Sequence, residues 1–407
     1  MTVYYGPGAQ GSGVAEVMGL LNGLNYHGAI GIDTLVTKCF GTLFAVCGGL
    51  CIGKEGPLVH IGAIIGVMCC YLPVEKFKIL QNDLHKRQLI ATGAACGVSV
   101  AFGSPIGGAL FAYEISKPNT FWTFSMLWRV FGATSFACFI LSILNSLSIG
   151  APLSLIDNGA IKFGYVDFTN TIFDLPAAII LGIVAALMGA LFVHVAIHLS
   201  ICRKKYITTK MRKVIECGIF AIVTSSVFYL TVLLVSKNCY KGPENSESTV
   251  RFKCPEGEYN PLATLVFNTE GGTLRQFFRY PELITNANEG YTNTQHIFSS
   301  LLIYLALWYF FTITTYNIWV PAGIFVPGMI MGCCLGLLYL EMMIFGFNLN
   351  LLRIGGQSYL VIGAGALLAS YTRLTYSLAV LMLETTDSIN LFLPITLSIF
   401  VSNAVAR

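Results

Sequence analysis

Lys54 and Glu55 lie between two long apolar stretches, in the segment Gly53-Lys54-Glu55-Gly56-Pro57. A charged side chain at membrane depth costs about 2.5 to 3.5 kcal/mol even on lenient insertion scales, so an ionisable residue there indicates a functional site. An ionised carboxylate can occupy an anion site, and protonation releases it. Glu55 is therefore the first candidate functional residue.

Two further segments have the same design, Gly11-Ser12-Gly13 and Gly323-Ile324-Phe325-Val326-Pro327. In each, glycines permit close approach of the backbone, and a helix is predicted to begin directly afterwards. Pro57 and Pro327 suit a first helical turn, where no backbone donor is lost. Free amides at a helix start, together with the helix dipole, favour an anion by about 0.3 to 2 kcal/mol per terminus. Several converging starts would therefore hold an anion weakly, as rapid passage requires.

The elements that position these segments are apolar helices. Of the 407 residues, 55% are hydrophobic and only 11% are charged, against about 25% charged in soluble domains. We therefore expect an all-α integral membrane protein with many spans. The apolar tracts lie near 35–52, 58–72, 89–114, 121–155, 173–201, 214–236, 297–318, 321–346, 358–383 and 391–406.

Several tracts are shorter than the roughly 20 residues of a straight span. Glycines are expected to break others, at Gly48-Gly49 and Gly107-Gly108. Paired interrupted helices are typical of transport sites between two inverted halves. A polar stretch near 145–172 separates two apolar blocks, so we predict two antiparallel halves, 1–168 and 169–407, with broken and tilted helices.

Charged and cysteine residues predict which loops face which side. One short loop carries six cations, which places it in the cytosol by the positive-inside tendency, with lipid-headgroup binding as an alternative. The six are Arg203, Lys204, Lys205, Lys210, Arg212 and Lys213. The polar loop near 237–296 then faces the lumen or exterior, where Cys239 and Cys254 form either a disulfide or two free thiols. No zinc-like CxxC spacing and no nucleic-acid module is present, and we expect no metal or other cofactor.

In their order and spacing, the three glycine-rich segments resemble the GSGIP, GKEGP and GxFxP signatures of the CLC family of chloride channels and chloride/proton exchangers. The likeness extends over most of the chain, including 93–97, 107–111 and 383–387. The segments 254–260 and 267–269 are similar to the lysosomal and vacuolar branch. That branch implies an intracellular membrane, with the plasma membrane as the alternative.

The resemblance implies a role for each matching residue. Ser12, with Gly13 beside it, would offer its hydroxyl to chloride, and the Ile324 and Phe325 amides would donate from the second half. Glu55 would be the gating glutamate. Lys54 would add positive potential at the entrance, and His60 is expected to pack locally. The remaining pore-motif residues are Gly11, Gly53, Gly56, Pro57, Gly323 and Pro327.

One departure from the family pattern concerns proton coupling. Exchangers of the family place two glutamates in succession where this chain has Glu114 and Ile115. Isoleucine cannot titrate, so the proton-glutamate position is lost, and we expect Glu114 to be a structural carboxylate. The sequence therefore favours a passive, voltage-gated chloride channel. A chloride/proton exchanger that uses another acid or a water chain is the alternative.

The resemblance also implies a homodimer with one pore per subunit, and it leaves room for an accessory membrane subunit. The family has helices before the serine motif, and after Arg407 it would have an inner-gate tyrosine and often CBS domains. The chain is therefore expected to be truncated at both ends, and a nonconducting subunit is a further hypothesis. An intramembrane serine enzyme is disfavoured, because Gln10 stands where a GxSG motif needs glycine.

Overall fold

The chain is almost entirely helical in the computed structural model. The structure describes residues 1–24, 26, 28–73, 75–116, 122–149, 174–235, 239–241, 249–285, 295–346 and 356–406. Among these residues, five helices are long and apolar enough to cross a membrane. They are α6 (Phe124–Ile149), α7 (Asp174–Tyr206), α8 (Lys210–Val235), α11 (Gln295–Thr315) and α12 (Phe325–Glu341). The predicted all-α, multi-span membrane fold is confirmed.

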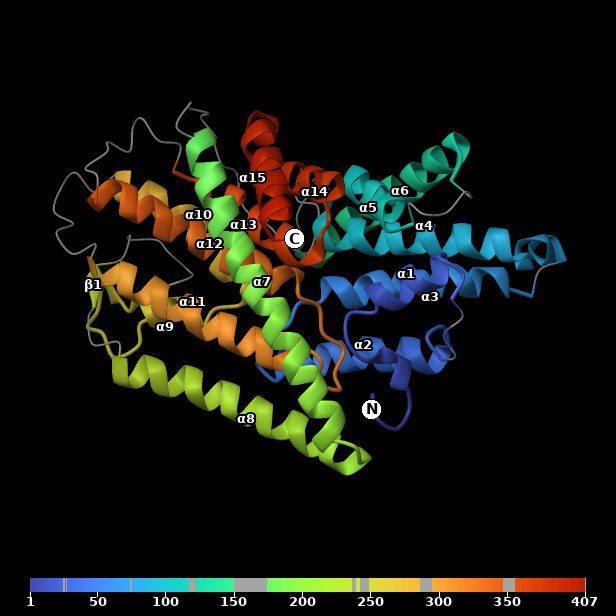
Figure 1. Cartoon of the computed structure of the whole chain (residues 1–407), viewed down its shortest axis with the longest axis horizontal. Helices are drawn as coiled ribbons and strands as arrows, with labels where there is room; N and C mark the ends of the chain where they lie inside the picture. Colours follow the sequence, from blue (N-terminus) through green and yellow to red (C-terminus); the bar gives the residue numbers. More distant parts are fainter. Residues whose placement is uncertain are drawn as a thin grey trace.

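Shorter helices fill the space between the long ones, in two blocks that lie side by side (Figure 1). The first block holds α1 (Val14–Leu21), α2 (Ile32–Cys47), α3 (Glu55–Cys70), α4 (Asp83–Phe102) and α5 (Pro105–Ile115) as well as α6. The second adds α9 (Pro261–Val266), α10 (Glu270–Thr285), α13 (Ser358–Thr372), α14 (Tyr376–Thr386) and α15 (Phe392–Val405). The short helical elements are the 3-10 helices η1 (Pro7–Ala9), η2 (Glu75–Gln81) and η5 (Ile389–Leu391) and the π-helix η3 (Met342–Gly346).

The predicted helix breaks were right at one place and wrong at another. Gly48 and Gly49 do end α2, and Gly49 has a φ of +70°, which glycine adopts without strain. The break between α4 and α5 falls at Gly103, with φ +69°, and not at Gly107-Gly108. A Cβ at Gly108 would lie 2.0 Å from Ser99 Oγ. Gly108 therefore serves close packing of α5 against α4, for which sequence alone gives the same signal as a break.

One pair of helices in each block packs closely through glycines. α3 packs on α4 through Gly62 and Gly93, and α12 packs on α13 through Gly332 and Gly363. A Cβ on Gly62 would lie 2.2 Å from the Gly93 carbonyl oxygen, and one on Gly332 would lie 2.6 Å from that of Gly363. Small residues thus let paired helices touch backbone to backbone, as membrane interfaces favour. The predicted boundary between residues 168 and 169 lies outside the described residues.

Helices α5 and α14 cap each other through two glutamates. Glu114, at the end of α5, accepts hydrogen bonds from the Thr375 amide (2.8 Å) and the Ser377 amide (3.1 Å) at the start of α14. Glu384, at the end of α14, accepts from the Ile106 amide (3.2 Å) and the Gly107 amide (2.9 Å) at the start of α5. This reciprocal arrangement fixes two antiparallel helices, one from each block, against each other.

Removal of one of these caps should destabilise the fold. We expect Glu384→Ala to lower the free energy of unfolding by about 1 to 2 kcal/mol, since orphaned amides lose a charged acceptor. Denaturant unfolding in detergent measures this. Asp83→Ala is the control, because it removes a carboxylate from the first turn of α4, where the side chain is 89% exposed. An equal loss in both variants would contradict the capping role.

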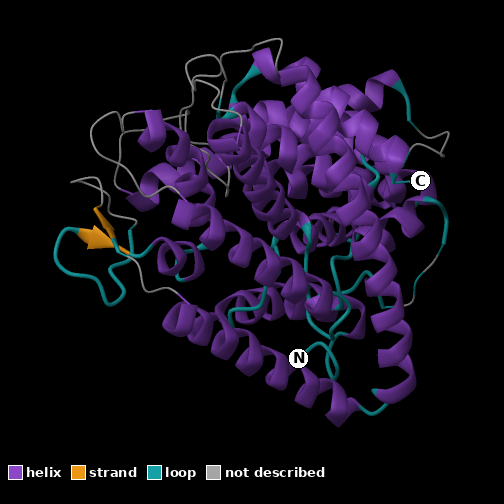
Figure 2. Cartoon of the chain, turned by 60° about the vertical axis from the view of Figure 1, so that its left-hand side comes forward, coloured by secondary structure: helices purple, strands orange, loops and turns teal. Residues whose placement is uncertain are grey.

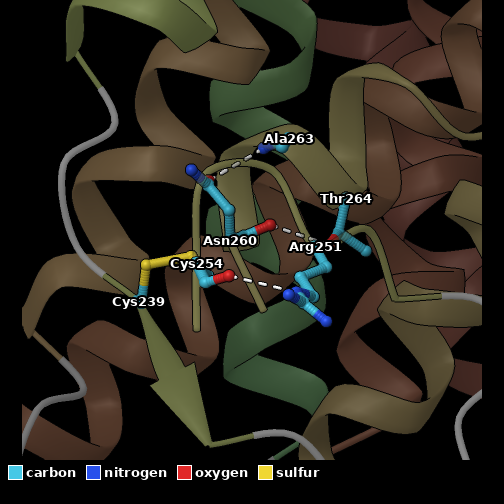
Figure 3. The surroundings of a disulfide bond; sticks show 6 residues. All are labelled: Cys239, Arg251, Cys254, Asn260, Ala263 and Thr264. Carbon is cyan, nitrogen blue, oxygen red and sulfur yellow. Dashed lines mark hydrogen bonds between the residues drawn. A yellow bond between two sulfur atoms is a disulfide. The ribbon is translucent and has the colours of Figure 1, made fainter. Parts of the chain in front are cut away.

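The two predicted loop regions lie at opposite ends of α8, whose 26 residues rise about 39 Å. Strand β1 (Tyr240–Lys241) pairs with β2 (Glu258–Tyr259) beyond its far end, at the edge of the helical body (Figure 2). There Cys239 and Cys254 are joined in a disulfide (Figure 3).

The segment after the disulfide is held by local hydrogen bonds. Arg251 donates to the Cys254 carbonyl oxygen at 3.1 Å, and Asn260 Oδ1 accepts from the Ala263 amide, also at 3.1 Å (Figure 3). Asn260 thereby caps α9. The segment is thus fixed where it leads into α9 and α10.

The basic loop at the other end of α8 is not a freely solvated surface throughout. Arg203 pairs with Glu216 at 2.7 Å and donates to the Tyr316 carbonyl oxygen at 2.6 Å. Lys213 Nζ lies 3.4 Å from the centre of the Trp319 ring. These contacts attach α7 and α8 to the linker that runs from α11 towards Gly323, so part of the predicted topology signal also positions the candidate site.

Candidate anion site

Two of the three glycine-rich segments meet directly, although about 270 residues separate them. The Gly53 amide donates to the Gly323 carbonyl oxygen at 2.7 Å, and the Gly323 amide donates back at 2.8 Å. This antiparallel bridge joins the two blocks through backbone alone. A Cβ on Gly323 would lie 2.8 Å from the Gly53 oxygen, so glycine is needed for the approach.

The third segment closes around this bridge. The Gly11 amide donates to the Val320 carbonyl oxygen at 3.0 Å, and the Ala322 amide donates to the Gly11 carbonyl oxygen at 3.1 Å. A Cβ on Gly56 would lie 2.8 Å from the Ser12 Cβ atom. The structure therefore brings all three predicted segments to one place, where the starts of α1, α3 and α12 converge.

These three helix starts lack a cap from their own N-cap side chains, although the Val14 amide in α1 donates weakly to Ser12 Oγ at 3.4 Å. Their N-cap residues are Gly13, Lys54 and Ile324, and none of the three caps its helix with a side-chain hydrogen bond. Pro57 and Pro327 both fall in the first turn, as predicted. Helix-start amides without an intrahelical partner must be satisfied by water, by a side chain or by a ligand. The arrangement thus offers amides and helix dipoles to an anion.

Aromatic and hydroxyl contacts hold the Ile324-Phe325 segment in place. The Phe325 ring packs edge-on against Phe102, with ring centres 5.7 Å apart, and against Phe111 at 6.4 Å. The Tyr371 hydroxyl donates to the Ile324 carbonyl oxygen at 3.0 Å. Sequence reasoning missed Tyr371. Its position in the middle of the apolar tract 358–383 gave no sign of this contact.

Glu55 is the first residue of α3, and its side chain is only 1% exposed. Neither carboxylate oxygen has a hydrogen-bond partner. The backbone amides of Glu55, Lys54 and Val326 point towards the carboxylate but do not meet hydrogen-bond geometry. A Cβ on Gly53 would lie 2.4 Å from Oε2, so the side chain lies over the bridge between the blocks. A buried carboxylate without partners costs several kcal/mol when charged, which fits a group that moves or takes up a proton.

Ser12 lies against Gly56 in the first turn of α3, and His60 lies in the second turn of the same helix. Ser12 Oγ accepts weakly from the Val14 amide at 3.4 Å, which leaves its hydroxyl hydrogen available. His60 is fully buried, with Nε2 2.9 Å from the Ala29 carbonyl oxygen, and its ring lies against Gly13. Gly13 has a φ of +84° and no room for a side chain. His60 thus packs locally and supports the serine turn, as predicted.

A cavity of about 790 Å³ lies beside the start of α3. Its charged lining residues are Lys54, Glu270, Arg275 and Arg279. Lys54 therefore lines a cavity, and its role at an entrance stays a prediction, whereas the three residues of α10 were missed. They follow the segment that carries the disulfide, and only the fold brings that segment to Lys54. We call this cavity the vestibule.

The structure places Ile115 at the end of α5, 3% exposed and within the apolar core. The neighbouring carboxylate of Glu114 is occupied by the start of α14. Glu114 is thus a structural group, as expected, and neither residue offers a free carboxylate to carry protons from α5. Among the described residues, no cluster of three or more His, Cys, Asp or Glu side chains could hold a metal ion.

A membrane fold in which three helix starts converge at one buried carboxylate defines a protein suited to holding an anion inside the bilayer. The chain belongs to the voltage-gated chloride channel (CLC) family, because the family's model matches residues 1–407. The predicted family resemblance is confirmed.

Three comparisons illustrate this membership. The chain is 32% identical to a mouse protein named H(+)/Cl(-) exchange transporter 7, over 98% of this chain and 49% of that protein. It is 30% identical to chloride channel protein C of Dictyostelium discoideum, over 100% of this chain and 54% of that protein. The crystal structure of a eukaryotic CLC transporter shares the fold, with a TM-score of 0.70 and 23% identity, over 100% of this chain and 60% of that one. The chain spans about half the length of these curated relatives.

Proposed function

We propose that this protein transports chloride across a membrane in exchange for protons, with Glu55 as the gate. The observation that carries this proposal is the buried, unpartnered Glu55 carboxylate where three helix starts converge. An ionised Glu55 competes with chloride for these amides, and protonation releases it. One group thereby links anion passage to proton uptake. Ser12 and the Ile324 and Phe325 amides are the proposed chloride ligands.

We favour exchange over the passive channel, which Ile115 indicated when the sequence was considered alone. The curated relatives described above include a protein named as an H(+)/Cl(-) exchanger, which supports coupling. Ile115 cannot titrate and Glu114 is hydrogen-bonded to the start of α14, so neither can carry protons between Glu55 and the far side of the membrane. Other groups or a chain of water must do so. A passive channel is the competing function, and Ile115 is the observation in its favour.

Coupled flux distinguishes the two. The full chain is reconstituted into liposomes, and an outward chloride gradient is imposed across a membrane otherwise impermeable to protons. We expect chloride efflux to drive protons into the liposomes, uphill against the proton gradient that this uptake creates. The reversal potential should then shift with both chloride and pH. A chloride current whose reversal potential ignores the proton gradient would overturn exchange and establish the passive channel.

The resemblance to the lysosomal and vacuolar branch supports an intracellular membrane as the site of action. Family membership supports a homodimer in which each subunit has its own pore. Both are proposals for the whole protein, as is an accessory membrane subunit.

A further inference from the structure

The vestibule contains one carboxylate among three cations. Glu270 is the first residue of α10 and lines the cavity together with Lys54, Arg275 and Arg279. An anion entering this cavity meets a net positive lining, in which a carboxylate weakens the attraction. Glu270 therefore lowers the attraction of the cavity for anions, so anion binding alone does not explain its position.

Glu55 is shut off from this cavity. Its side chain is 1% exposed and does not line the vestibule, whereas the adjacent Lys54 does. A proton that leaves Glu55 towards the vestibule must therefore cross a short layer of protein. A titratable group that both borders the cavity and lies near Glu55 would shorten that step.

Glu270 occupies that position. Lys54, the residue before Glu55, lines the vestibule together with Glu270, and the charge of Glu270 acts on Glu55, on Cys51 and on Tyr304 of α11. Cys51 also lines the vestibule, while Tyr304 is fully buried. Among the described groups that border the cavity, Glu270 alone is a carboxylate.

The charged and titratable groups that face Glu270 are few. From the α3 segment they are Lys54, Glu55 and Cys51, and from α11 there is Tyr304. From α10 itself, Arg275 and Arg279 line the same cavity. A thiol and a phenol release protons only at alkaline pH in water, and arginine does not release one. A carboxylate is the group suited to exchange protons with Glu55 at neutral or acidic pH.

We propose that Glu270 relays protons between the vestibule and Glu55 and thereby sets the pH at which the gate responds. The proton on the Glu270 carboxyl passes to the ionised Glu55 carboxylate, directly or through water, and Glu270 is protonated again from the vestibule. Neighbouring carboxylates titrate as a pair, and the charge of one favours a proton on the other. This inference rests on the proposed exchange function.

Glu270→Gln removes both the relay and the charge while it preserves shape. With the full chain in liposomes, we expect exchange at neutral vestibule pH to fall at least about tenfold. Acidification of the vestibule should restore it, because Glu55 then takes protons directly from water. The pH of half-maximal exchange should move towards acid by about one unit, since ionised Glu270 no longer favours protonation of Glu55. Glu270→Asp, which keeps a carboxyl group, should restore exchange at neutral pH.

Glu256→Gln is the matched control. It removes the same charge from the segment that precedes α9, where Glu256 is 91% exposed and pairs with Arg251 at 3.5 Å. Its pH profile should equal that of the wild type. An unshifted profile in Glu270→Gln, or a loss by the same factor at every pH, would overturn the relay and leave exchange intact. A wild-type protein that moves chloride without protons would overturn exchange and the relay together.

Discussion

Glu55→Gln should abolish proton movement while chloride flux continues and no longer depends on pH. Glutamine copies the shape of a protonated glutamate but cannot ionise. The variant therefore cannot compete with chloride as an anion and cannot carry a proton. Chloride-driven proton uptake in liposomes should fall to background. Chloride efflux should stay, at every pH, near the level that the wild type reaches when Glu55 is protonated.

The same substitution should not destabilise the protein. The Glu55 side chain is 1% exposed and its carboxylate has no partner, so its charge costs several kcal/mol. Neutralisation removes this cost. The free energy of unfolding in detergent should thus stay equal or rise, which separates a functional loss from a folding defect.

Asp83→Asn is the control for this experiment. It neutralises a carboxylate in the first turn of α4, where the side chain is 89% exposed, far along the chain from the glycine-rich segments. Its coupled transport should equal that of the wild type. Proton uptake that persists in Glu55→Gln would remove Glu55 from the transport cycle. Proton uptake that disappears equally in Asp83→Asn would show that charge loss as such is responsible.

The residues that sequence predicted best are those whose signal is local. Glycine and proline near Ser12, Glu55 and Phe325 indicate close backbone approach and helix starts. The structure places the three segments together. Their meeting is a long-range event, which only the family resemblance could anticipate. The assignment of chloride to this site stays a prediction.

Other features could not be read from sequence, because their signals were ambiguous or non-local. Gly107 and Gly108 looked like a break, but the helix breaks at Gly103. Glycine marks both left-handed backbone and tight helix packing, and only the position of the neighbouring helix decides between them. Arg203 looked like part of a solvated loop, yet it holds the α11 linker through the Tyr316 carbonyl oxygen.

The residues that line the vestibule could not be predicted from the sequence either. Glu270 follows a loop in the second block, and Lys54 belongs to the first. Neither spacing nor composition links them. Because binding cavities form between elements, their lining depends on packing across the whole fold, and a carboxylate such as Glu270 becomes a candidate only once that packing is known.

Gly323→Ala should abolish transport, because the bridge between the two blocks has no room for a methyl group. The added Cβ would lie 2.8 Å from the Gly53 carbonyl oxygen and 3.0 Å from the Gly56 amide nitrogen. Both are backbone atoms that support the start of α3, so relief of the clash must displace Glu55 relative to the Ile324 and Phe325 amides. Displacement of reacting groups by about 1 Å can cost about a hundredfold in rate. We expect chloride flux to fall by at least that factor.

Gly218→Ala separates this effect from a general loss of glycine. Gly218 lies in the middle of α8, and a Cβ there would meet nothing within 4 Å. Alanine in an open helix interior stabilises by about 0.5 to 1 kcal/mol relative to glycine, so this variant should keep full flux and unfold no more easily. If Gly323→Ala folds and still transports at the wild-type rate, the contact between Gly53 and Gly323 cannot be what aligns the two blocks. The same pair of hydrogen bonds between Gly53 and Gly323 positions Glu55 and joins the two blocks. Unfolding is therefore measured alongside flux, because it distinguishes a displaced Glu55 from a protein that fails to fold.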